Sequence, residues 1–240
     1  MTDSKTFTHR LDRITLCERI RDHTKEAYLL IYNVMKGIAL ANAAYTLACM
    51  LTKRPYWPAY ILWGASMSAL LVSHLTTMTG ILLSTSRRNP FDTVLPFALS
   101  ITEFLLFSTL QPEVRNHIVI VTWRSWYLAY GAWSLTACLL ILNRVLQTKV
   151  SDVDPADRPL SELMCSFKKK LWENLCVAGV LALLSLGFGL LLGILPPIAE
   201  GVHGLLGGVV LVTMTVVLIK NEVGHRSILA VAKGERWSDR

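Results

Sequence analysis

Long apolar runs alternate with short charged segments along this chain of 240 residues. A helix that crosses the hydrocarbon core of a bilayer, about 30 Å thick, needs roughly 20 mostly apolar residues. Six runs meet this length: residues 27–51, 58–83, 91–110, 118–142, 175–195 and 201–219. A membrane β-barrel would show short alternating strands instead. The pattern therefore predicts an all-α, polytopic integral membrane protein, built as a bundle of six transmembrane helices.

The composition supports a membrane environment. Hydrophobic residues make up 52% of the chain and charged residues only 17%, and the mean hydropathy is +0.44. A soluble domain carries about 25% charged residues. The net charge of +7 comes mainly from the loops and ends, so we expect anionic lipid headgroups, and no nucleic acid, as its counter-charge.

Lysine and arginine are distributed unequally between the two sides of the predicted spans. Nineteen of them lie in the N-terminal segment, the second and fourth loops and the C-terminal tail, against Lys53, Arg54 and Arg115 in the other loops. Basic residues are retained on the cytoplasmic side of a membrane. We therefore expect both termini in the cytoplasm, and a plasma (inner) membrane as the location.

Loop lengths and charge divide the chain into five parts. Residues 1–26 form a basic cytoplasmic segment, 27–143 a four-helix transmembrane unit, 144–174 a cytoplasmic loop, 175–220 a Gly-rich transmembrane hairpin, and 221–240 a basic cytoplasmic tail.

The loop at 144–174 contains apolar residues at helical spacing: Leu160, Leu163, Met164, Phe167 and Leu171. This spacing places them on one face, while the neighbouring lysines point away from it. We predict an amphipathic cytoplasmic helix. Such a helix either lies in the headgroup layer of the membrane or docks a partner protein.

Small residues recur every four positions in the last two spans: Ser185, Gly189 and Gly193 in one, and Gly204 and Gly208 in the next. This spacing lets helix backbones approach closely in lipid, where packing drives association. We predict that these residues pack helices together within an antiparallel hairpin.

Three ionisable residues fall at similar depths in the first three spans. At about 1.5 Å per residue, Lys36 and His74 lie about 13 Å from the predicted cytoplasmic surface and Glu103 about 18 Å. A charge at mid-membrane costs at least about 2.5 kcal/mol. We therefore expect Lys36 and Glu103 to face the bundle interior and to pair, with Asn33 completing the hydrogen bonding.

The second span carries further polar residues near this layer. Ser73 and Thr77 share one narrow face with Ser66, and His74 lies at the edge of that face. Histidine can change charge between about pH 5 and 8. The cluster has two interpretations: a pathway for an ion, proton or polar substrate, or a buried ion pair that fixes helix register.

Motifs typical of catalysis are missing from the sequence, which has no GxSxG, HExxH or Walker sequence. The five cysteines are scattered and contain no CxxC pair, so we expect no metal site, no cofactor and no enzymatic activity. The sequence favours an oligomeric channel or transport-type protein. The alternative is a non-catalytic membrane subunit or sensor that binds a partner through the amphipathic helix and the basic ends.

The predicted orientation can be tested by cysteine labelling. Cysteines placed at Pro55 and Glu113 should react with a membrane-impermeant thiol reagent outside intact cells, and one at Pro155 only after permeabilisation. Labelling at Pro155 in intact cells would reverse the orientation.

Overall fold

Six helices make up most of the part of the chain that the structure, a computed structural model, describes: residues 13–83, 91–115, 118–147, 158–194 and 200–232. The helices are α1 (Arg13–Lys53), α2 (Pro58–Leu83), α3 (Phe91–Ser108), α4 (Trp123–Gln147), α5 (Arg158–Leu191) and α6 (Glu200–Ala232). Strands β1 (Glu113–Arg115) and β2 (Ile118–Ile120) form a small antiparallel hairpin between α3 and α4, with Val114 opposite Val119.

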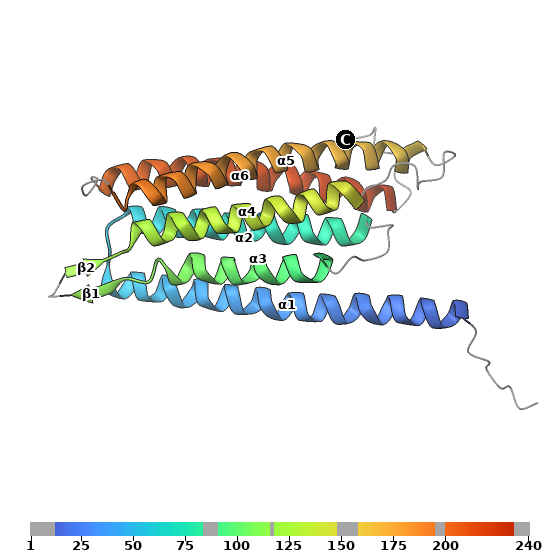
Figure 1. Ribbon diagram of the computed structural model, residues 1–240, viewed down its shortest axis with the longest axis horizontal. Coiled ribbons are helices and arrows are strands. Elements are labelled where there is room, and N and C mark those ends of the chain that lie inside the picture. Colours follow the sequence, from blue (N-terminus) through green and yellow to red (C-terminus); the bar gives the residue numbers. More distant parts are fainter. Residues whose placement is uncertain (1–12, 84–90, 116–117, 148–157, 195–199, 233–240) are drawn as a thin grey trace, which may run out of the picture.

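The helices lie nearly parallel in three tiers of two (Figure 1): α5 with α6, α4 with α2, and α3 with α1. The helix α1 begins and α6 ends at the same end of the bundle, which we call the terminal end; β1 and β2 mark the opposite, hairpin end. The largest buried side chains, Trp126, Tyr130 and Trp133, come from α4 in the middle tier.

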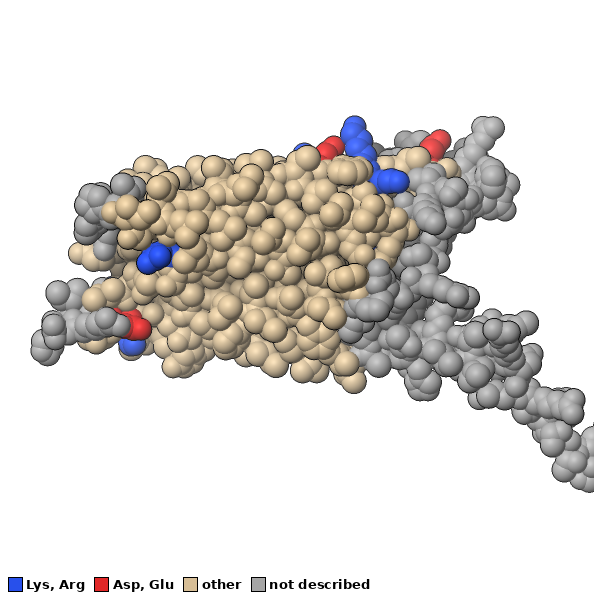
Figure 2. Space-filling view, in the orientation of Figure 1, with Lys and Arg blue, Asp and Glu red and all other residues tan. Residues whose placement is uncertain are grey.

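Within the described residues, five helices are long and apolar enough to cross a membrane: α1 from Leu30, α2, α4, α5 and α6. The apolar part of α3, Val94–Ser108, is shorter. Figure 2 shows charged side chains near both ends of the bundle and an uncharged band between them on the face in view. Large apolar side chains such as Leu183 and Leu205 point outward, with 76% and 71% of their surfaces exposed. The described part of the chain is thus helical, as the sequence predicts, apart from one hairpin that it does not predict, and its surface suits lipid.

Three predicted boundaries differ from the structure. Residues 118–120 belong to β2, and α4 begins only at Trp123. The amphipathic helix predicted in the loop at 144–174 forms the first part of α5, which runs without a break from Arg158 to Leu191, so the fifth helix begins well before residue 175. The reason lies in residues 160–178, which contain no glycine or proline that would end a helix. Similarly, α6 continues beyond residue 219 to Ala232, so part of the predicted tail is helical.

The turn between α1 and α2 has a simple sequence cause. Arg54 follows the last residue of α1 in a left-handed conformation, with φ of 50°, and its N–H bonds to the Met50 carbonyl at 2.8 Å. This is a common way to end a helix. Pro58 then occupies the first position of α2, where its missing N–H is not needed.

The helix α5 packs along α4, and α6 packs along α2, while α5 and α6 meet each other through few residues. Glycines allow the closest approaches. A Cβ atom at Gly131 of α4 would lie 2.5 Å from the Leu186 side chain and 3.0 Å from its backbone nitrogen. A Cβ atom at Gly189 of α5 would lie 3.0 Å from Leu128. The small residues therefore serve intramolecular packing, but between different helices from those expected.

The other small residues predicted to pack helices differ in what they contact. Ser185 is buried, and a Cβ atom at Gly193 would lie 2.8 Å from the Arg124 guanidinium. One at Gly204 would lie 2.1 Å from the Trp57 ring, so this glycine admits an aromatic side chain rather than another backbone. Gly208 has no neighbour within 4 Å at its Cβ position, so no close helix approach depends on a glycine there.

Adding a single methyl group should test the α4–α5 contact. We expect Gly131→Ala to lower the free energy of unfolding by about 1–3 kcal/mol, because the rigid backbone of α5 leaves no room for the new Cβ. Gly179→Ala is the matched control, since its Cβ position in α5 is open. Thermal unfolding in detergent would compare the two; equal midpoints would contradict the close contact.

Candidate functional site

A buried ion pair joins α1 to α3. The Lys36 ammonium donates hydrogen bonds to both carboxylate oxygens of Glu103. Lys36 is 4% exposed and Glu103 fully buried. An unpaired charge in such a place would be very costly, and the two charges offset each other's loss of solvent. The pairing that the sequence predicts from depth is therefore present.

Ser73 of α2 completes the centre. Its hydroxyl oxygen accepts a hydrogen bond from Lys36 at 2.6 Å. The same hydroxyl lies within hydrogen-bonding distance of Glu103 Oε1 and 2.8 Å from the Leu70 carbonyl. A hydroxyl has only one proton, so it donates to one of these oxygens at a time. We call Lys36, Ser73 and Glu103, which come from three helices, the charged centre.

Polar side chains along one seam hold α1 and α3 in this register. The Asn42 amide nitrogen donates to the Phe104 carbonyl at 2.8 Å and to Ser108 at 2.9 Å. Nearer the hairpin end, the Thr46 hydroxyl donates to the Phe107 carbonyl at 3.2 Å. Asn42 and Thr46 lie four residues apart on one face of α1, and this spacing of polar residues within an apolar span is the signal that our sequence analysis missed.

Other predicted members of the cluster lie outside the charged centre. Asn33 is exposed on α1 and makes no hydrogen bond to the described residues. His74 is half-buried and stacks on Tyr32, with ring centroids 5.8 Å apart and planes at 8°. The Lys36 ammonium lies 5.3 Å from the centroid of the same Tyr32 ring, so His74 contacts this ring and makes no hydrogen bond to Lys36, Ser73 or Glu103. Thr77 is buried, and its hydroxyl has no partner among the described residues.

A largely apolar cavity reaches the charged centre from the side of α4, α5 and α6. We call it the inner cavity, and its lining includes Ser73 itself. The residues around it are Val72, Ser73, Thr76, Leu99, Trp133, Ala137, Leu140, Ile141, Asn174, Val177, Ala178, Met214 and Val217. The charged centre is thus not sealed on all sides by packed side chains.

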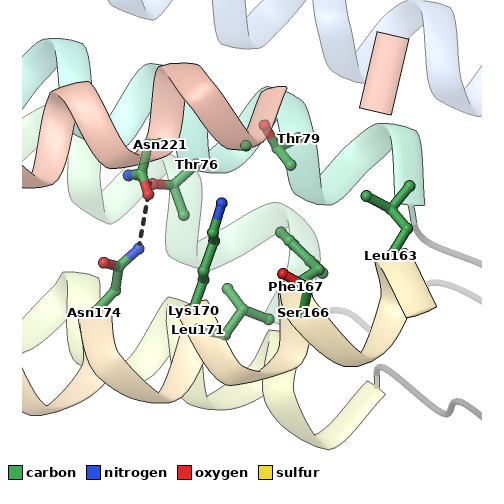
Figure 3. A pocket seen from close by; sticks show the side chains of 10 residues that line it. Thr76, Thr79, Leu163, Ser166, Phe167, Lys170, Leu171, Asn174 and Asn221 are labelled. Atoms are coloured by element: carbon green, nitrogen blue, oxygen red, sulfur yellow. Dashed lines mark hydrogen bonds between the residues drawn. The ribbon is translucent and has the colours of Figure 1, made fainter. Parts of the chain in front are cut away.

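A second pocket opens near the terminal end, between α2, α5 and α6 (Figure 3). We call it the end pocket. It is lined by Thr76, Thr79, Leu163, Ser166, Phe167, Lys170, Leu171, Asn174, Asn221 and Gly224. The two cavities share Thr76 and Asn174. Between them, Asn174 donates to Asn221 at 3.1 Å, and Asn221 donates to Thr76 at 3.0 Å.

Buried polar atoms on α4 also face the interior without partners. The Trp133 indole N–H, which belongs to a side chain of the inner cavity, has no hydrogen-bond acceptor among the described residues. The Tyr130 and Ser134 hydroxyls likewise have none. By contrast, the Trp126 indole N–H donates to Ser66 of α2 at 2.9 Å. Buried polar groups are normally satisfied, so these atoms of α4 are exceptions among the described residues.

The apolar stripe predicted for a cytoplasmic helix is part of the bundle. Leu163, Met164 and Leu171 are buried, and Phe167 is half-buried. Leu171 packs against Ile141 and Val145 of α4. The side chain of Leu160 lies outside the described residues. Neighbouring helices therefore cover most of the described stripe, and Leu163, Phe167 and Leu171 also line the end pocket.

The class of this protein follows from the helices and the charged centre. Several membrane-length apolar helices around an enclosed ion pair indicate a multi-pass membrane protein. No protein-family model, no curated protein and no solved structure matches the chain. Within the described residues, no group of three or more His, Cys, Asp or Glu side chains could hold a metal ion.

Paired substitutions should test the charged centre. Lys36→Met or Glu103→Gln alone should each lower the free energy of unfolding by about 3–5 kcal/mol, because the other member would stay buried and unpaired. The double variant should recover most of this loss. Folded yield and the thermal midpoint in detergent would measure both effects.

Asn33→Leu, a change of an exposed polar residue on the same helix, is the control and should leave stability unchanged. A double variant whose loss equals the sum of the single losses would show that the two residues act independently.

Proposed function

We propose that this chain is a six-span transport-type membrane protein, with both termini in the cytoplasm, in which a small cation or proton passes through the charged centre. The single observation that carries the proposal is the inner cavity, which reaches Ser73, the residue bonded to both charges. A purely architectural ion pair gains nothing from such a cavity, since contact with packed side chains would stabilise the bundle more.

The route from the cytoplasm begins at the end pocket. Thr76 and Asn174 belong to both cavities, so polar groups connect the terminal end with Ser73. Amide and hydroxyl oxygens along this route are suitable ligands for a partly dehydrated cation or for water. The positive-inside pattern of the loops favours the cytoplasm for this end of the bundle.

The charged centre supplies the selective step. Glu103 is the acceptor for an arriving cation or proton, which competes with the Lys36 ammonium for the same oxygens. When the ammonium leaves the carboxylate, the face of the Tyr32 ring, 5.3 Å away, and the Ser73 oxygen remain within its reach. While an arriving cation and the Lys36 ammonium are both present, the single carboxylate leaves the buried centre with one uncompensated positive charge, and this cost limits how long the cation occupies the site.

Aromatic side chains of α4 close the route toward the hairpin end. Trp126, Tyr130 and Trp133 are buried one after another along α4. The ring centroids of Trp126 and Tyr130 are 4.9 Å apart, and those of Tyr130 and Trp133 are 5.4 Å apart. A conformation that admits an ion from the outside would have to separate these rings. We therefore assign the arrangement to a state open toward the cytoplasm.

The alternative function, a subunit or sensor, finds less support. Docking through Leu163, Met164 and Leu171 would require these side chains to leave the bundle that now buries them. A homo-oligomer or a membrane-complex partner remains a prediction, for which the exposed apolar faces of α1, α5 and α6 supply surface.

Flux through purified protein should test the function. Proteoliposomes containing a dye for protons, Na⁺ or K⁺ should dissipate a gradient of at least one of these ions faster than liposomes without protein. The folded Lys36→Met, Glu103→Gln double variant should show no more flux than empty liposomes, while Asn33→Leu should retain it. Flux in the double variant equal to that of the parent would make the charged centre architectural. The lack of flux for all three ions would contradict an ion pathway.

A further inference from the structure

An unpaired lysine lies in the end pocket, at a place where the hydrocarbon core should end. Lys170 precedes the end of α5 at Leu191 by 21 residues, which correspond to about 32 Å of helix. The hydrocarbon core of a bilayer is about 30 Å thick. If α5 leaves the core near its C-terminal end, the Lys170 ammonium therefore lies at the boundary between acyl chains and headgroups.

The surroundings of Lys170 give it room but no counter-charge. Its side chain extends from α5 into the space between Asn221 and Thr79 (Figure 3). A Cβ atom at Gly224 of α6 would lie 2.8 Å from the ammonium nitrogen, so the glycine makes space for it. Lys170 forms no ion pair or hydrogen bond with the described residues.

The lining of the end pocket matches an amphiphile. Polar groups lie beside the ammonium: the Ser166 hydroxyl, which has no partner among the described residues, and the Asn221 amide. Apolar side chains, Phe167 and Leu171, lie on the same side of α5. A phosphate can pair with the Lys170 ammonium and accept a hydrogen bond from the Ser166 hydroxyl, and an acyl chain can pack on the apolar side chains.

We propose that the end pocket is a binding site for an anionic phospholipid, whose headgroup phosphate binds Lys170 and Ser166. A basic pocket between transmembrane helices on the cytoplasmic side suits such lipids, because this leaflet is rich in anionic headgroups. The site does not depend on ion transport through the charged centre. It explains why Lys170, which has no counter-charge among the described residues, lies between three helices.

The test compares two lysines that are neighbours in sequence but differ in place. Lys170 lines the pocket, whereas Lys169 is exposed and does not. The full chain in detergent, at 0.15 M salt to screen distant charges, is titrated with short-chain phosphatidylglycerol, and bound lipid is counted by native mass spectrometry. We expect Lys170→Gln to weaken binding about five- to tenfold and Lys169→Gln to change it less than about twofold.

A second variant keeps the charge and fills the space. Gly224→Leu should also weaken binding of phosphatidylglycerol, because the new side chain occupies the position beside the ammonium. Elution of each variant in size-exclusion chromatography checks the fold, which should persist since Lys170 has no partner to lose among the described residues.

Three outcomes would overturn the proposal. Equal weakening by Lys169→Gln and Lys170→Gln would indicate attraction by the whole basic surface. Equal affinity for short-chain phosphatidylcholine would show that the anionic headgroup is not recognised. Inorganic phosphate alone that binds as tightly as the lipid, and displaces it, would assign the site to free phosphate.

Discussion

A salt bridge enclosed between helices constrains the whole first half of this protein. Lys36 and Glu103 lie 67 positions apart in the chain and on different helices, yet neither charge can be left alone in a medium of low dielectric constant. The requirement that they meet sets the relative depth of α1 and α3. Ser73 adds α2 to the same point, and the seam of Asn42 and Thr46 keeps α1 and α3 aligned toward the hairpin end.

Two kinds of contact hold the bundle together, and they act in different places. Polar bonds dominate between α1 and α3, whereas α4 and α5 approach through Gly131 and Gly189 with close van der Waals packing. Lipid chains are as apolar as leucine, so the hydrophobic effect cannot sort helices inside a membrane. Hydrogen bonds to backbone carbonyls and small residues that let backbones approach supply the specificity instead.

Function and lipid recognition would share the terminal end of the bundle. The hydrogen bonds that the Asn174 amide donates to Asn221, and the Asn221 amide to Thr76, lie between the end pocket and the inner cavity. A lipid phosphate at Lys170 would lie on the outer side of these amides, and an ion bound at Glu103 on their inner side. Because the proposed ion route begins at the end pocket, a lipid headgroup in that pocket would change both the access to the second site and the electrostatic potential that an arriving cation meets.

The sequence by itself determined the helical class, the positions of most helices and the pairing of Lys36 with Glu103. Segment length, hydropathy and the depth of a charge in the membrane can all be read from the linear order of residues. Only the tertiary structure decided what each face meets. Depth does not fix rotation about a helix axis, so Asn33 points outward and His74 stacks on Tyr32 although both share the layer of the charges. Small-residue spacing does not name a partner, and Gly189 thus packs on α4 rather than on α6. An apolar stripe such as Leu163 to Leu171 is stabilised equally by headgroups, a second protein or its own bundle, since burial of apolar surface is non-directional, and here the neighbouring helices cover it.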